Sequence, residues 1–323
     1  MHNKTEIFLE NKGLLFSMAY NMLGSVDEAE DMVQETFLKW MEVTVDTVRH
    51  AKAYLVKMVT NMCINYMNST RAKREEYVGM WLPEPLVNYN ADNTHSRIES
   101  YHALSIGILV MLEKLTALER AVFLLREIFA YDYFELAEIF DKTEDNCRQI
   151  LKRAKEHLGK DVKRFEVDMK AHEKMLGNFL TACAEGNMNV LIELLKEDIV
   201  LFADGGGRVI SVNGQRLTAA LYPIGGRENV ARFLISVTTK VIQFFAADFR
   251  REVVMANGSP AMLAYAGDTP LSLTILECDG EKIANVFVQT NLDKLKPFIK
   301  TPSRLQLSNR GPSGFKYVNP DLP

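Results

Sequence analysis

The chain has 323 residues, enough for two or three domains. Its hydrophobic share of 47% and charged share of 25% are ordinary for a globular protein. A net charge of −4 excludes a protein that binds nucleic acid through bulk positive charge, so any such binding must come from local patches.

The cysteines and the N-terminal residues indicate the compartment. The four cysteines are far apart and form no CxxC pair, so the sequence predicts no metal site, no disulfide framework and a reducing cytoplasm. The first residues, MHNKTEIFLENKG, lack the apolar core of a signal peptide, and no apolar run approaches the ~20 residues that span a bilayer. We therefore expect a cytoplasmic protein with no cofactor and no membrane contact.

The pattern of residues 5–77 predicts helices. In GSVDEAEDMVQETFLKWMEV, Ser25 and Glu28 have capping-box spacing. Apolar residues then recur every three or four positions and predict one buried face: Ala29, Val33, Phe37 and Trp40. A second helix is expected over about 51–67, ending in the basic segment STRAKR. Residues 78–105 are polar and contain WLPEP at 81–85, which predicts a linker.

Residues 106–165 are again typical of helices and include a helix–turn–helix pattern. One helix is expected over Tyr133–Phe140, Asp141 and Lys142 form the turn, and Thr143 can cap the next helix. The buried side of that second helix is expected to hold Cys147, Ile150, Leu151, Ala154 and Leu158. Its exposed side then carries Arg148, Gln149, Lys152 and Arg153, residue types that contact base edges and phosphates. The alternative is an ordinary helical hairpin inside a bundle.

The pattern changes at about residue 168. Helices over about 170–185 and 188–196 precede seven β-like runs separated by glycine turns: IVLFAD, RVISVN, VIQFFAADF, REVVMA, AMLAYA, LSLTILECD and KIANVFVQ. This pattern predicts an α+β domain with a curved antiparallel sheet. Residues 301–323 carry four prolines and are expected to be loosely ordered.

The helical segments resemble a known family. DEAEDMVQETFLKW and AYLVKMVTNMCINYMNSTRAKR resemble region 2 of bacterial sigma factors of the extracytoplasmic-function type, and the segment from LTALERAVF to KRAKEHL resembles their region 4. WLPEP at 81–85, DGGG at 204–207 and NLDKL at 291–295 resemble three signatures of the sigma-J-like group, which carries a fused SnoaL-like domain. The two sigma regions cover about half of the chain.

The resemblance implies a multidomain fold, with two all-α sigma domains and a C-terminal α+β SnoaL-like cone. The expected boundaries are 1–77 for region 2, 78–105 for the linker, 106–165 for region 4, 168–300 for the SnoaL-like domain and 301–323 for a flexible tail.

The resemblance also implies partners, namely the RNA polymerase core and promoter DNA. The resemblance implies that Asp31, Gln34 and Glu35 bind the core enzyme. The alternative is the ordinary enrichment of acidic residues in the first turns of helices. Contacts to the single-stranded −10 element fall to Asn61, Asn65, Arg71, Lys73 and Arg74. Contacts to the double-stranded −35 element fall to Arg148, Gln149, Lys152 and Arg153. Helix capping near a frayed end is the alternative for the asparagines, and a solvated basic helix end is the alternative for the three cations. The family commonly has Gly in the turn where this chain has Asp141.

The C-terminal domain has two interpretations. Relatives of this fold include enzymes with an acidic residue in the cavity, and Asp204 could be that residue, although the sequence offers no convincing partner for it. The resemblance instead implies a built-in regulator, in which Asp204, Gly205, Gly206 and Gly207 form a contact surface together with Asn291, Asp293 and Lys294. We expect that surface to meet region 2 or the linker. Leu292 stands where the signature has Pro, which removes a φ restraint from that turn.

The linker signature adds an anchor. Trp81, held extended by Pro83 and Pro85, is expected to dock on a neighbouring domain, or alternatively to close the local core of region 2. The sequence therefore favours a non-enzymatic sigma factor regulated in cis. The alternatives are an isomerase or hydrolase fused to a DNA-binding module, and a regulator that senses a small ligand in the C-terminal cavity.

Overall fold

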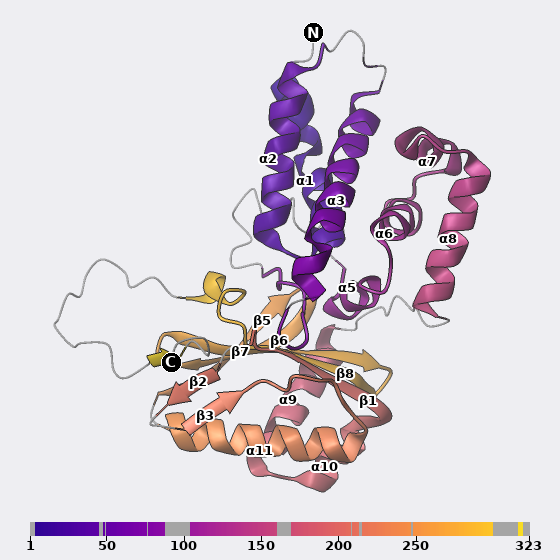
Figure 1. Cartoon of the computed structure of the whole chain (residues 1–323). Helices are drawn as coiled ribbons and strands as arrows, with labels where there is room; N and C mark the ends of the chain where they lie inside the picture. The colour runs from indigo at the N-terminus through magenta and orange to yellow at the C-terminus, as the bar shows by residue number, and fades with distance from the viewer. Residues whose placement is uncertain are drawn as a thin grey trace, which may run out of the picture. The chain divides into compact units, whose positions relative to one another are not determined.

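The structure, a computed structural model, describes residues 4–44, 48, 50–75, 77–87, 104–159, 169–207, 209–212, 215–246, 248–299 and 316–318. For 71–75, 209–212, 215–218 and 316–318 it describes the backbone only. The chain divides into two compact units, coloured along the sequence in Figure 1. The helical unit comprises Met1–Glu75 and Leu86–Arg164, and the mixed unit comprises Glu76–Pro85 and Phe165–Pro323. The WLPEP segment therefore belongs with the C-terminal part of the chain.

Three helices form the first half of the helical unit: α1 Lys4–Leu23, α2 Val26–Glu42 and α3 Ala51–Glu75. Ser25 caps α2 by accepting a hydrogen bond from the Glu28 backbone N–H at 3.4 Å, while the Glu28 carboxylate accepts one from the Tyr66 hydroxyl at 2.6 Å. The fully buried Trp40 donates to the Lys4 carbonyl at 2.9 Å and fastens α2 to α1. The amphipathic face predicted for α2 is confirmed, with Phe37 half-buried.

The end of α3 was predicted wrongly. The helix continues to Glu75, well beyond the predicted end near residue 67. Ser69 and Thr70 do not end it, because both hydroxyls donate back to the Tyr66 carbonyl, at 2.8 and 2.9 Å. The Arg, Ala and Lys residues that follow are good helix formers.

The second half of the helical unit contains the helix–turn–helix. Its elements are α5 Ile106–Leu112, α6 Ala117–Phe123, a π-helical turn Leu124–Ile128, α7 Tyr133–Phe140 and α8 Glu144–Leu158. Asp132 and Glu135 form a capping box at the start of α7, and Thr143 caps α8. Asp141 ends α7 in the left-handed conformation, with φ 51° and ψ 49°, so the turn survives without glycine. All five predicted core residues of α8 are buried.

In its described residues, the mixed unit combines three α-helices and the short 3-10 helix Lys296–Phe298 with two sheets. Its helices are α9 Met169–Glu185, α10 Met188–Leu194 and α11 Arg227–Phe245. Its strands are β1 Leu195–Asp204, β2 Val209–Val212, β3 Gln215–Thr218, β4 Ile224–Gly225, β5 Phe249–Ala256, β6 Ser259–Ala266, β7 Thr269–Asp279, β8 Lys282–Gln289 and β9 Lys316–Val318. The larger sheet has the order β4-β1-β8-β7-β6-β5, and β3-β2-β9 form a smaller one. Apart from β9, the predicted flexible tail lies outside the described residues.

One face of the larger sheet packs on the helices, as Figure 1 shows for α9, α10 and α11. The core there includes Leu176 and Phe179 from α9, Leu191 from α10, Leu234 from α11 and Leu201 from β1. This helix-covered sheet confirms the predicted α+β class. Because side chains alternate along a strand, β1 presents its remaining residues to the opposite face.

Two predictions for this unit were wrong. The sheet is not purely antiparallel, since β1 and β8 pair in parallel, with Asp204 opposite Gln289. The run VIQFFAADF is mostly helix, because α11 continues to Phe245. Val241, Phe244 and Phe245 recur at helical spacing and pack on Ala266 and Leu271, so tertiary contacts override the β propensity of these bulky residues.

Candidate functional site

Asp204 is the centre of a polar cluster in the mixed unit. It ends β1, directly after the core residue Ala203, so its side chain lies on the face of the sheet opposite the helices. Its side chain is fully buried. The Asp204 carbonyl accepts two hydrogen bonds from Thr290, from the backbone N–H at 2.8 Å and from the hydroxyl at 2.9 Å, which join the end of β1 to the segment after β8.

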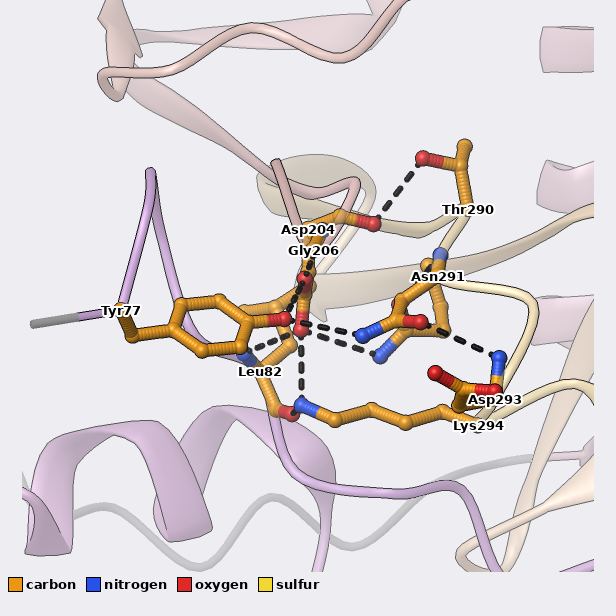
Figure 2. Close-up of polar contacts among 9 residues, drawn as sticks. Tyr77, Leu82, Asp204, Gly206, Thr290, Asn291, Asp293 and Lys294 are labelled. Carbon is orange, nitrogen blue, oxygen red and sulfur yellow. Dashed lines mark hydrogen bonds and ion pairs between the residues drawn. The ribbon is translucent and has the colours of Figure 1, made fainter. Parts of the chain in front are cut away.

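The Asp204 carboxylate directly binds residues 77–85, which belong to the mixed unit and are called the linker segment from here on (Figure 2). Its Oδ1 accepts from the Tyr77 hydroxyl at 2.6 Å and from the Gly206 backbone N–H at 2.9 Å. Its Oδ2 accepts from the Leu82 backbone N–H at 3.0 Å and pairs with the Lys294 ammonium at 2.8 Å. Both oxygens of this buried carboxylate are therefore occupied by donors, which the sequence did not identify.

Lys294 holds the same segment from the other side. Its ammonium also donates to the Leu82 carbonyl, and it lies 4.3 Å from the centre of the Trp81 ring. A cation over an indole face is a favourable arrangement, more so when water is largely excluded. The Lys294 side chain is 14% exposed, and Leu82, Pro83 and Pro85 are buried. Trp81 thus contacts the C-terminal part of the chain, as the docking alternative requires.

The NLDKL turn is closed by Asn291. Its side-chain oxygen accepts from the Asp293 backbone N–H at 3.1 Å, and its carbonyl accepts from the Lys294 backbone N–H at 3.0 Å. Its amide donates to the Tyr77 hydroxyl at 2.9 Å. These hydrogen bonds supply the local order that the signature proline would give, so Leu292 does not leave the turn unrestrained.

The three glycines of DGGG each lie where a larger residue would collide. A Cβ on Gly205 would come within 2.8 Å of the Ala219 Cβ, one on Gly206 within 2.6 Å of the Asn291 amide nitrogen, and one on Gly207 within 2.9 Å of the Val78 Cβ. Gly206 and Gly207 also have positive φ angles, 60° and 70°. The motif therefore lets the backbone approach both the NLDKL turn and the linker segment.

We expect Gly206→Ala and Gly207→Ala to weaken the docking of the linker segment. Each adds the left-handed backbone cost of about 1–2 kcal/mol and a collision. Gly258→Ala is the matched control, because Gly258 has φ 75° but nothing within 4 Å of an added Cβ. Limited proteolysis of the segment around Trp81 measures docking. Equal protease sensitivity of all three variants would contradict the role assigned to the close approach.

The residues expected to bind the polymerase core lie along one exposed face of α2. Asp31, Gln34 and Glu35 are all exposed, and Glu35 pairs with Lys39 at 2.7 Å. Leu38 continues this face and is 64% exposed. Singly exposed apolar residues are common on protein surfaces, so Leu38 adds an apolar group to this face but does not by itself mark an interface.

The residues expected at the −10 element lie on α3. Asn61 is half-buried and Asn65, one turn further on, is exposed. Both lie within a helix that continues for at least ten more residues, so neither caps a frayed helix end. The side chains of Arg71, Lys73 and Arg74 lie outside the described residues.

The exposed face of α8 carries Arg148, Gln149, Lys152 and Arg153. Arg148 pairs with Glu144 and Asp145, both at 2.8 Å, and its guanidinium lies 4.6 Å from the centre of the Tyr133 ring. These contacts fix the orientation of Arg148 at the start of the helix. An open groove of about 660 Å³ follows the same face, lined by Tyr133, Arg148, Leu151, Lys152, Lys155, Glu156 and Gly159.

Several cluster residues were not predicted. Tyr77 and Leu82 flank Trp81 and bind Asp204, and Gln289 is paired with Asp204 in the sheet register. A tyrosine directly after the charged residues KREE could have suggested a buried contact at position 77. Leu82 contributes only backbone atoms to the cluster's hydrogen bonds, so no residue-type signal could reveal it.

Other titratable groups of the mixed unit are perturbed by burial. Burial raises the pKa of Glu277, against the effect of its hydrogen bond from Asn285 at 2.6 Å. Burial also lowers the pKa of His172 on α9, with the Leu276 backbone acting in the opposite direction. Among the described residues, no three His, Cys, Asp or Glu side chains gather as metal ligands. No helix in those same ranges has the length and apolarity required to cross a membrane.

Comparison with known proteins defines the class. Residues 7–73 match the family model of Sigma-70 region 2, and residues 106–158 match that of Sigma-70, region 4. With the helix–turn–helix in place, the chain carries matches to both sigma-70 regions, in order along the sequence.

Its full-length relatives define the group. The ECF RNA polymerase sigma factor SigJ of Mycobacterium tuberculosis (strain ATCC 25618 / H37Rv) is 27% identical over 309 residues, which cover 92% of this chain and 95% of the relative. The probable ECF RNA polymerase sigma factor SigI of M. tuberculosis (strain CDC 1551 / Oshkosh) is 24% identical over 289 residues, 89% and 93% of the two chains. The crystal structure of M. tuberculosis SigJ has the same fold, with a TM-score of 0.69 at 24% identity over 91% of this chain and 98% of that one. The chain is thus similar to SigJ over nearly its whole length and shares its fold, in which a unit of helices and sheet follows the two sigma regions.

Proposed function

We propose that this protein is an RNA polymerase sigma factor that recruits the core enzyme, recognises the −35 and −10 promoter elements and starts transcription. The observation that carries the proposal is the presence of both sigma-70 regions in order, the second with an exposed cationic recognition helix. Its action would be in the cytoplasm, where the polymerase and the chromosome are.

The roles of the helices follow from their exposed residues. The α2 face with Asp31, Gln34, Glu35 and Leu38 offers acidic and apolar groups to a basic surface of the core enzyme. On α3, the amides of Asn61 and Asn65 suit an unstacked −10 base, whose Watson–Crick edge they can hydrogen-bond. On α8, Arg and Gln side chains suit base edges of the −35 duplex and Lys152 suits its phosphates.

The mixed unit would regulate this activity in cis by holding the linker segment. Asp204, Lys294 and Asn291 bind Tyr77 and Leu82 through buried and part-buried hydrogen bonds, which would make the docking of this segment specific. The held segment follows directly after α3, which carries the asparagines proposed for the −10 element. Release or docking of the segment would therefore change how freely the two sigma regions reach their elements.

We further propose that the mixed unit has no catalytic role of its own. The acidic residue suggested for proton transfer, Asp204, has its two oxygens occupied by Tyr77, Gly206, Leu82 and Lys294. A carboxylate saturated by protein donors has no lone pair directed at a substrate. Asp204 is therefore a poor candidate for a general base, and its contacts instead favour a structural role in holding the linker segment.

Reconstituted transcription tests the proposal. Purified core polymerase alone should give no specific transcripts from a library of genomic promoters, and addition of the full-length protein should give defined start sites. The absence of stimulation on every promoter, at protein concentrations that saturate core binding, would overturn the proposal.

A further inference from the structure

Within the helical unit, a lysine on α3 binds the end of the first helix of the helix–turn–helix. The Lys57 ammonium donates to the Asp141 carboxylate at 2.7 Å and to the Glu138 carbonyl at 2.8 Å. It therefore lies at the C-terminus of α7, where the helix dipole favours a cation. This contact joins the two sigma regions directly.

Asp141 has a side chain that the turn itself does not require. The turn is closed by backbone hydrogen bonds alone, because the N–H groups of Asp141 and Lys142 both donate to the Ala137 carbonyl. Glycine would adopt the left-handed conformation without the cost of a Cβ. The Asp141 carboxylate instead points to Lys57, which gives a physical reason for an aspartate in this position.

A second contact between the two regions is buried. Arg120 on α6 is fully buried, and its Nε donates to the Asn21 carbonyl of α1 at 3.0 Å. The Asn21 side-chain oxygen accepts from the Leu104 backbone N–H at 3.3 Å. In the described residues, the regions are therefore joined by buried hydrogen bonds and helix packing, and the Lys57–Asp141 pair adds an exposed contact.

This packed arrangement cannot span a promoter. The −35 and −10 positions are about 25 base pairs apart, or about 85 Å of B-form DNA. In the structure, Lys57 lies only one helical turn before Asn61 and touches the end of α7. The α3 helix is itself only about 37 Å long. One region must leave the other before both can reach their elements.

We propose that the α3 surface around Lys57 is an interaction surface for the chain's own helix–turn–helix turn, and that the Lys57–Asp141 pair favours a closed form in which the sigma regions cannot bind both promoter elements together. The contact itself is independent of the proposed function, while its inhibitory effect rests on that function.

Zero-length cross-linking tests the contact. A carbodiimide should join the Lys57 amine to the Asp141 carboxylate as an amide in the free full-length protein, with loss of water to the reagent. The Lys196–Asp279 pair of the mixed unit is the internal standard, because it is 2.8 Å long and partly exposed, close to the 2.7 Å of the Lys57–Asp141 pair. We expect the Lys57–Asp141 product, relative to the standard, to fall at least several-fold when core polymerase and promoter DNA are added. Its absence in the free protein, or an unchanged yield in the promoter complex, would overturn the proposal.

Two variants test the effect. Asp141→Gly and Asp141→Asn both remove the charge and both tolerate the left-handed turn. Because the pair is exposed, with side-chain exposures of 33% and 80%, we expect promoter binding by the holoenzyme to rise by about 1.5- to 5-fold. Binding of the free protein to a −35 duplex should stay unchanged.

The outcomes are distinct. If promoter binding rises with Asp141→Gly but not with Asp141→Asn, the effect comes from the backbone of the turn and not from the ion pair. If promoter binding rises with neither variant, the ion pair does not restrain the protein. Either result overturns the proposal. A wild-type protein that binds no promoter with core polymerase would instead refute the proposed sigma function, and the cross-link in the free protein would still report on the closed form.

Discussion

Replacement of Asp204 by asparagine is expected to lower the free energy of unfolding of the mixed unit by about 3–5 kcal/mol. The fully buried carboxylate neutralises Lys294, which is itself 14% exposed, and removal of one partner leaves a charge in a poorly solvated place. The amide of asparagine also brings two N–H groups to a site where Tyr77, Leu82 and Gly206 already donate. Chemical denaturation followed by circular dichroism measures the loss.

Two controls separate this effect from the loss of any ion pair. Asp279→Asn breaks a 2.8 Å pair with Lys196 whose side chains are 34% and 39% exposed, so it should cost less than about 1 kcal/mol. Adding Lys294→Met to Asp204→Asn should recover part of the loss, because no uncompensated charge then remains.

Tryptophan fluorescence reports whether the linker segment is released. The chain has two tryptophans, and Trp40 is fully buried in the helical unit while Trp81 lies under the Lys294 ammonium. In Asp204→Asn the accessible fraction of the emission should rise when acrylamide is added. If Asp204→Asn were as stable as Asp279→Asn and Trp81 remained protected, the cluster would not be what holds the segment.

Local sequence patterns were sufficient to predict the helix–turn–helix. On α8 the five buried residues recur at helical spacing, Thr143 caps the first turn, and Asp141 adopts the left-handed conformation that the turn needs. All of these features arise within about 25 residues of chain. The exposed position of the proposed −35 residues follows from the same periodicity.

The Asp204 cluster could not be derived in this way. Its contacts join residues 127, 122 and 90 positions apart in the chain, and one partner, Leu82, contributes only backbone atoms. Resemblance to the DGGG, NLDKL and WLPEP signatures named three segments but not the bonds between them. The parallel pairing of β1 with β8 was missed for a related reason, because strand composition does not specify which distant strand is the neighbour.

The linker segment also gives a physical meaning to the three signatures. DGGG supplies a carboxylate and a backbone with no Cβ atoms in the way, and NLDKL supplies an ammonium and an amide. WLPEP supplies an aromatic face and backbone groups. Each signature would be of little use without the other two, so we expect substitutions in one to be non-additive with substitutions in another.

The second large expected effect is on DNA binding, because the two sigma regions are proposed to contact different promoter elements. Arg153→Ala should weaken binding to the −35 duplex by about 1–3 kcal/mol, or about 5- to 150-fold, if Arg153 contacts a base edge. Arg153 is exposed, so its loss should leave the fold intact. Arg232→Ala, an exposed arginine on α11, is the control for the same change in net charge.

Asn61→Ala should have the opposite profile, because its amide is proposed to hold an unstacked −10 base and not the duplex. Binding of the −35 duplex should match that of the wild-type protein, while promoter opening by the holoenzyme, measured by permanganate reactivity of unpaired thymines, should fall severalfold. Salt titrations complete the test: an Arg153→Ala defect that is uniform across DNA sequences, with a smaller salt dependence, would make Arg153 a phosphate contact. If Asn61→Ala and Arg153→Ala weakened duplex binding equally, the assignment of α3 and α8 to different promoter elements would be wrong.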